Sequence, residues 1–213
     1  VEWEEIAGVG IGCPGIITSE MGVVDYTCNL GWNKVPLAAE FTANLDKPAF
    51  VSNDANVAAL GEAMFGTGRD YHDVIFVTLG TGVGGGVIIE NKLFEGYKSK
   101  GAELGHMVIE VGGEQCGCGR RGCMEAYCSA TAMENDRQSA MWEYVGGDIG
   151  KVDGKTAFEC SKRGDAAAQK VIENYIMYLG EGLSNFINIF RPQAIILGGG
   201  VCAQGDYLVK PVQ

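Results

Sequence analysis

The chain has 213 residues, of which 46% are hydrophobic and 20% charged, so it can bury the core of one or two globular domains. Its formal net charge of −11, without a basic stripe, argues against binding to a nucleic-acid backbone. No apolar run approaches the ~20 residues of a membrane span, so we expect no membrane partner.

Short strands and turns are predicted for the first part of the chain. Residues 6–11 are typical of a buried strand, and residues 16–24 are typical of a hairpin. A further strand at residues 49–51 leads into a segment whose apolar periodicity is helical from Ala55 onward.

The middle of the chain alternates between strands and glycine-rich turns. Residues 74–79 predict a strand that ends in such a turn, and residues 86–89 predict its partner. Residues 107–111 predict one more strand before a cysteine-rich loop.

The longest amphipathic pattern covers residues 166–190, with Asp165 as the expected N-cap. Residues 194–197 then predict a buried strand. Hairpins combined with strand–turn–helix units indicate an α/β fold.

The chain contains eight cysteines, a number that can indicate a secreted disulfide scaffold. Three of them cluster in one loop, and the others are scattered among apolar residues: Cys13, Cys28, Cys128, Cys160 and Cys202. We therefore expect a cytoplasmic protein with reduced thiols.

The clustered cysteines predict a metal site. Cys116, Cys118 and Cys123 follow the pattern Cys-x-Cys-x4-Cys, and His106 stands ten residues upstream. Three thiolates and one imidazole suit tetrahedral Zn²⁺, and the intervening glycines permit tight turns. We predict a closed, structural zinc site; the alternatives are buried free thiols or a disulfide.

Two glycine-rich turns follow predicted strands. The first, L-G-T-G-V-G-G-G at residues 79–86, can direct several backbone N–H groups toward a phosphate. It is not a Walker A loop, because no Gly-Lys-Ser/Thr follows, and the alternative is a glycine-rich hairpin. The second, at residues 198–200, can equally be the turn that starts a helix.

Asn53 and Asp54 stand between a predicted strand and a predicted helix. On the pattern alone, the favoured interpretation of Asp54 is an N-cap whose oxygen accepts an amide hydrogen from the first turn. The alternative is a general base.

Four motifs occur in order: N-D-A-N at residues 53–56, the turn at residues 79–86, E-L-G-H at residues 103–106, and C-G-C-G-R-R-G-C-M-E at residues 116–125. Together they resemble the signature of the ROK family of bacterial sugar kinases and repressors, in particular its glucokinase branch. The resemblance extends over nearly the whole chain. It implies an actin/hexokinase-like (ribonuclease H-like) two-lobed ATPase fold.

The resemblance also implies a role for each motif. Asp54 aligns with the general base that takes a proton from the sugar hydroxyl, which favours that role over the N-cap. ATP, with Mg²⁺, phosphorylates a hexose, most simply glucose to glucose 6-phosphate in glycolysis. The residues that contact the hexose are Asn53, Glu103, His106 and Glu125. The residues that face ATP are Gly80, Thr81, Gly82, Gly84, Gly199 and Gly200.

Zinc would hold Glu103 and Glu125, which flank its ligands, at a fixed distance, and carboxylates are strong acceptors for sugar hydroxyls. We expect a homodimer. Two other functions stay open: a sugar-sensing repressor with a helix-turn-helix upstream, or a kinase for another hexose such as N-acetylmannosamine.

We expect residues 1–53 to be the remainder of a small N-terminal lobe. Residues 54–213 are expected to form a larger lobe with the zinc loop at 106–123, truncated at its C-terminus. An Asp-x-Gly-Gly-Thr phosphate hairpin is expected before Val1, so this segment alone should not turn over ATP.

A helix that begins near Ser129 loses its apolar positions after Met133. We therefore expect residues to be missing between Met133 and Glu134; the alternative is a short helix followed by a polar loop.

Overall fold

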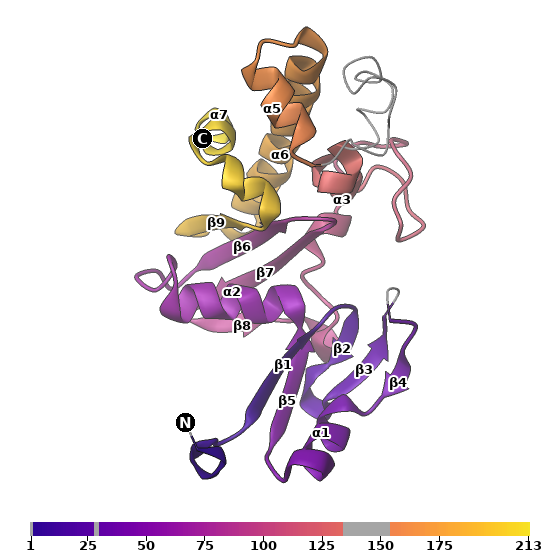
Figure 1. Ribbon diagram of the computed structural model, residues 1–213, viewed down its shortest axis with the longest axis vertical. Coiled ribbons are helices and arrows are strands. Elements are labelled where there is room, and N and C mark those ends of the chain that lie inside the picture. Colours follow the sequence, from indigo (N-terminus) through magenta and orange to yellow (C-terminus); the bar gives the residue numbers. More distant parts are fainter. Residues whose placement is uncertain (1, 28–29, 134–153) are drawn as a thin grey trace. The chain divides into compact units, whose positions relative to one another are not determined.

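The computed structural model describes residues 2–27, 30–133 and 154–213 (Figure 1). The chain divides into two compact units, each assembled from several stretches. Unit 1 comprises Val1–Phe76, Gly85–Glu103 and Gln193–Ile196, and unit 2 comprises Val77–Gly84, Leu104–Pro192 and Leu197–Gln213. The predicted division into lobes after residue 53 stays a prediction. The inferred join between Met133 and Glu134 lies outside the described residues.

Unit 1 contains a parallel pair of strands that leads to the first helix of the site. Strand β1 (Val9–Cys13) pairs with β5 (Ala49–Asn53), so that Cys13 stands opposite Asn53 (Figure 1). Helix α2 (Asp54–Phe65) begins directly where β5 ends. The first strand therefore begins at Val9, three residues later than the sequence pattern predicts.

A small antiparallel sheet completes the core of unit 1. It consists of β2 (Ile16–Thr18), β3 (Val23–Tyr26) and β4 (Asn33–Val35), and helix α1 (Leu37–Leu45) follows it. The predicted hairpin at residues 16–24 is thus confirmed. The buried core residues are Cys13, Ile17, Val24, Leu37 and Val51, with Trp32 packed against them.

A four-stranded sheet has the order β8-β7-β6-β9. Its strands are β6 (Val74–Leu79), β7 (Val83–Ile89), β8 (Lys92–Phe94) and β9 (Ala194–Gly198). Strands β7 and β8 form an antiparallel hairpin, and the left-handed φ values of Glu90 (50°) and Asn91 (62°) make its tight turn.

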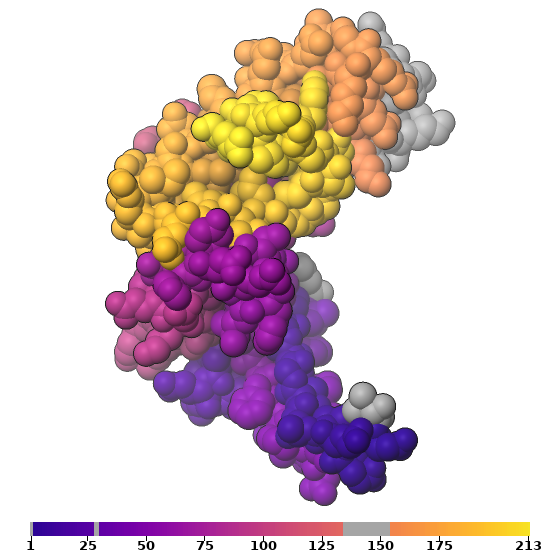
Figure 2. All heavy atoms as spheres, turned by 90° about the vertical axis from the view of Figure 1, so that its left-hand side faces the viewer, coloured from indigo at the N-terminus to yellow at the C-terminus, as the bar shows by residue number. Residues whose placement is uncertain are grey.

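The helices of unit 2 gather around one long helix. They are α3 (Glu125–Cys128), α5 (Thr156–Lys162), α6 (Ala166–Phe190) and α7 (Asp206–Val212). Helix α6 contacts the other three, and Figure 2 shows the yellow atoms of α7 at the surface. The predicted helix at residues 166–190 is confirmed, and Asp165 caps it by accepting the Ala168 N–H at 2.8 Å. Among the described residues, no helix is long and apolar enough to cross a membrane.

Short 3-10 turns connect these elements: η1 (Trp3–Glu5), η2 (Ser19–Met21), η3 (Tyr97–Ser99), η4 (Leu104–His106) and η6 (Gly200–Gln204). The predicted strand at residues 107–111 is wrong. Only an isolated bridge joins Val108 to Cys123, because the cysteine loop offers this segment no extended partner, and Val111 is 94% exposed.

Candidate functional site

The N-cap of helix α2 is Asn53. The Asn53 side chain accepts hydrogen bonds from the Ala55 N–H at 2.9 Å and the Asn56 N–H at 3.2 Å. Its amide nitrogen donates to the Gly15 carbonyl at 3.1 Å. Asn53 is therefore the N-cap, and its amide is fixed at both ends.

Asp54 is the first helical residue and its side chain is exposed. One of its oxygens accepts the Ala55 N–H at 2.9 Å. Gly12 of β1 packs closely against α2, because a Cβ there would lie 2.7 Å from Val57 Cγ2. The helix start thus presents a carboxylate to solvent while its neighbour does the capping.

Glu103 is also exposed and ends a segment with unusual backbone geometry. Lys98, Ser99 and Ala102 all have left-handed φ values, of 55°, 55° and 61°. Such conformations cost energy in residues other than glycine, so the surrounding contacts must hold this segment in place.

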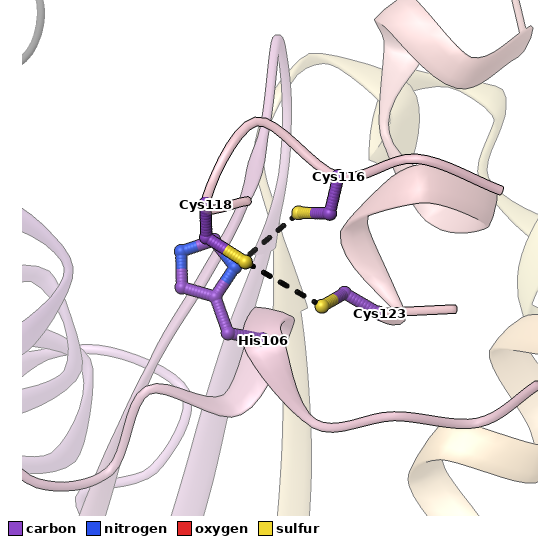
Figure 3. A group of neighbouring side chains, drawn as sticks. All are labelled: His106, Cys116, Cys118 and Cys123. Atoms are coloured by element: carbon purple, nitrogen blue, oxygen red, sulfur yellow. Dashed lines mark hydrogen bonds between the residues drawn. The ribbon is translucent and has the colours of Figure 1, made fainter. Parts of the chain in front are cut away.

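The predicted metal ligands converge in unit 2. His106 comes from η4, and the three cysteines come from the loop before α3 (Figure 3). The ligand atoms of His106, Cys116, Cys118 and Cys123 all lie within 4.8 Å of one another. Cys118 Sγ is 3.7 Å from Cys123 Sγ, and Cys116 Sγ is 3.7 Å from His106 Nδ1.

The two distances of 3.7 Å are close to those between the ligands of a zinc tetrahedron. With Zn–S bonds of about 2.3 Å, two sulfurs of a tetrahedral site lie about 3.8 Å apart. Burial raises the pKa of the Cys116 thiol to about 12, whereas the Arg120 backbone N–H lowers the pKa of Cys118. The donor set and its spacing therefore fit Zn²⁺, whose binding displaces the thiol protons.

The predicted phosphate turn connects β6 to β7. The turn consists of Gly80, Thr81 and Gly82, Gly84 already belongs to β7, and Thr81 at the tip is exposed. Gly199 packs on the start of this turn, because a Cβ there would lie 2.4 Å from the Leu79 carbonyl oxygen. The two glycine-rich turns that are far apart in sequence are thus neighbours in unit 2.

Glu125 lies between the cysteine loop and the phosphate turn. Its Oε2 accepts the Val83 N–H at 3.0 Å. Its Oε1 is 3.7 Å from Cys116 Sγ and 4.0 Å from His106 Nδ1. The predicted site residues are divided between the units. Asn53, Asp54 and Glu103 belong to unit 1, whereas His106, Glu125 and the predicted nucleotide-binding glycines belong to unit 2.

Several residues that support the site could not be found from the sequence. Glu95 accepts hydrogen bonds from Ser19 at 2.8 Å and from Ser52 at 3.2 Å, just before the Asn53 cap. In unit 2, Thr131 donates to the Thr81 carbonyl at 2.9 Å. These partners are distant in sequence, and no local motif in the chain signals them.

Comparison with known proteins decides the family. The family description "ROK family" matches residues 2–213. This chain belongs to the ROK family. A glucokinase of Thermotoga maritima is 38% identical over 218 residues, covering 99% of this chain and 69% of that protein.

A solved ROK family structure agrees with this assignment. The glucokinase from Streptomyces griseus, crystallised with glucose and AMPPNP, has a TM-score of 0.84 and 34% identity, covering 98% of this chain and 70% of that one. This similarity confirms the predicted actin/hexokinase-like α/β fold. The predicted enzyme class, an ATP-dependent hexose kinase, is confirmed by the same relatives.

Repressors of the family are similar as well. The xylose repressor of Bacillus subtilis is 34% identical over 196 residues, covering 92% of this chain and 49% of the repressor. Membership of the ROK family alone therefore does not separate an enzyme from a sugar sensor.

Proposed function

We propose that this ROK chain is part of an ATP-dependent glucokinase that converts glucose to glucose 6-phosphate. The observation that carries the proposal is the start of α2, where Asn53 caps the helix and leaves the Asp54 carboxylate exposed. The glucokinase of Thermotoga maritima, at 38% identity over 99% of the chain, points to the same substrate.

Phosphorylation of glucose by ATP needs a general base and a binding site for the phosphates. Asp54 takes the proton of the glucose 6-hydroxyl. The hydroxyl oxygen forms a bond to the γ-phosphorus, and the bond between that phosphorus and ADP breaks. Phosphoryl transfer has a loose transition state, so the position of the carboxylate matters more than its basicity. An exposed carboxylate at a rigid helix start suits that task.

The nucleotide is proposed to bind at the two glycine turns of unit 2. Backbone amides of Thr81 and Gly82 receive the β- and γ-phosphates, because the Gly80 N–H donates to the Gly82 carbonyl and the Val83 N–H donates to Glu125. Gly199 and Gly200 leave room for the adenosine. Mg²⁺ accompanies ATP and neutralises phosphate charge. We assign none of the described residues to this ion.

The hexose is proposed to contact Asn53, Glu103, His106 and Glu125. Carboxylates and imidazole form directional, charge-assisted hydrogen bonds with sugar hydroxyls. A zinc ion on His106 and the three cysteines would serve a structural purpose, fixing the loop that carries Glu125. The expected homodimer, the cytoplasmic location and a place in glycolysis stay predictions.

A panel of hexoses tests the proposal. The full-length protein is assayed for ADP formation with glucose, mannose and N-acetylmannosamine at equal concentrations. We expect the highest kcat/KM with glucose. A higher kcat/KM with N-acetylmannosamine would show that glucose is not the preferred substrate. A protein that binds sugar without turning over ATP would favour the repressor function.

A further inference from the structure

The turn between β6 and β7 is held from one side by the segment that follows the cysteine loop. The Ala130 N–H donates to the Gly80 carbonyl at 2.7 Å, and the Thr131 hydroxyl donates to the Thr81 carbonyl at 2.9 Å. The Val83 N–H donates to Glu125 Oε2 at 3.0 Å. The shape of this exposed turn therefore depends on residues 125–131.

This segment is itself anchored in the core of unit 2. Met124 and Cys128 are fully buried, and the Cys128 carbonyl accepts a hydrogen bond from the Tyr175 hydroxyl of α6 at 2.9 Å. A carbonyl partner inside the core restricts the motion of α3. The segment is therefore a rigid support for the turn.

Val83 is contacted from the metal-ligand side too. Gly105 of η4 packs so closely on it that a Cβ would lie 1.9 Å from the Val83 carbonyl oxygen. Gly82 has a close neighbour as well, because a Cβ there would lie 2.5 Å from Glu125 Oε2 at the end of that side chain. Neither glycine can take a side chain without displacing the turn or the carboxylate.

We propose that Glu125 and Thr131 are positioning residues for the nucleotide phosphates, acting through the backbone of residues 80–83. Glu125 then has two separate tasks, since one oxygen fixes Val83 while the other faces the cysteine loop. The inference rests on the proposed kinase function and adds to it the residues that shape its phosphate turn.

Thr131 gives the cleaner test, because its hydroxyl bonds the turn and it is not among the proposed hexose contacts. Thr131→Val removes the donor at nearly constant volume, and Thr131→Ser is the matched control that keeps it. We expect Thr131→Val to weaken MgADP binding about three- to tenfold by calorimetry without sugar, and to raise the KM for ATP similarly. The KM for glucose should stay within about twofold in both variants.

Glu125 is tested by a pair of substitutions in the same binding assay. Glu125→Gln keeps an acceptor for the Val83 N–H, so MgADP binding without sugar should be retained while glucose binding weakens. Glu125→Ala leaves that N–H without its partner, and MgADP binding should weaken about three- to tenfold. Thermal unfolding of each variant establishes that it is folded.

The outcomes separate this inference from the proposed function. Equal MgADP affinity of Thr131→Val and Thr131→Ser, or wild-type affinity in Glu125→Ala, overturns the positioning inference even if glucose is phosphorylated. Weaker MgADP binding by Thr131→Val and Glu125→Ala supports the positioning inference even if the wild-type protein prefers another hexose. A wild-type protein that binds no MgADP overturns it as well.

Discussion

Replacing Asp25 by Asn should destabilise unit 1. Asp25 of β3 is only 9% exposed, and its carboxylate accepts hydrogen bonds from Thr18 at 2.7 Å, from Lys100 at 2.8 Å and from Lys34. Lys100 belongs to the segment with left-handed φ values that precedes Glu103. The carboxylate thus holds that segment against the small sheet.

The size of the effect follows from these contacts. Hydrogen bonds to a charged group contribute about 1.5–3 kcal/mol each when well shielded. Solvent screening reduces this, because the Lys34 and Lys100 side chains are 71% and 42% exposed. Since Asn keeps one acceptor, we expect Asp25→Asn to lower the free energy of unfolding by about 1–3 kcal/mol at pH 7.

The loss should also depend on pH. Lys100, Lys34 and the Thr18 hydroxyl hold the pKa of Asp25 well below its ordinary value. The stabilisation is therefore complete above the unfolded pKa of about 3.9 and is lost as the pH falls from there toward the lower folded pKa. The difference between the wild type and Asp25→Asn should be largest above about pH 5 and should narrow by about pH 3.

Urea unfolding followed by tryptophan fluorescence and circular dichroism measures this difference, because Trp32 packs against the core of unit 1. Asp70→Asn is the matched control, since the Asp70 side chain is 83% exposed and lies 4.0 Å from its nearest cationic partner. The reasoning about Asp25 is refuted if Asp25→Asn and Asp70→Asn are equally stable at pH 7. It is also refuted if the difference in unfolding free energy between the wild type and Asp25→Asn is as large at pH 3 as at pH 7.

Two further predictions concern the predicted hexose and metal residues. Purified protein should contain about one zinc per chain, and removal of the metal by a chelator should make Cys116, Cys118 and Cys123 accessible to alkylation. A native protein that contains no metal and whose thiols are alkylated at once would contradict this prediction. Glu103→Gln in the full-length protein should raise the Kd for glucose about tenfold or more, because a charge-assisted hydrogen bond is lost, and an unchanged affinity would remove Glu103 from the site.

Much of the fold follows from patterns in the sequence. The bounds of α6 could be predicted because its apolar period is long and Asp165 marks its start. The clustering of His106 with Cys116, Cys118 and Cys123 could be predicted because the spacing of the cysteines is local and the ligand chemistry of a metal site is restrictive. Their convergence within 4.8 Å agrees with that expectation.

Other features could not be predicted because they depend on contacts distant in sequence. The apolar residues at 107–111 suggested a strand, but their partner is the irregular cysteine loop, which allows only an isolated bridge. The pattern at residues 53–54 alone favours Asp54 as the N-cap of α2, and that interpretation is wrong, because Asn53 is the cap. That choice depends on Gly15, whose carbonyl orients the Asn53 amide.

The turnover of Asp54→Asn tests the central claim most directly. Because Asn53 supplies the N-cap, the substitution should leave the stability of α2 nearly unchanged. In the full-length protein we expect glucose binding within about threefold of the wild type and a kcat that is about 10²–10⁴-fold lower, as for loss of a general base. A variant that binds glucose and phosphorylates it at the wild-type rate would contradict the account.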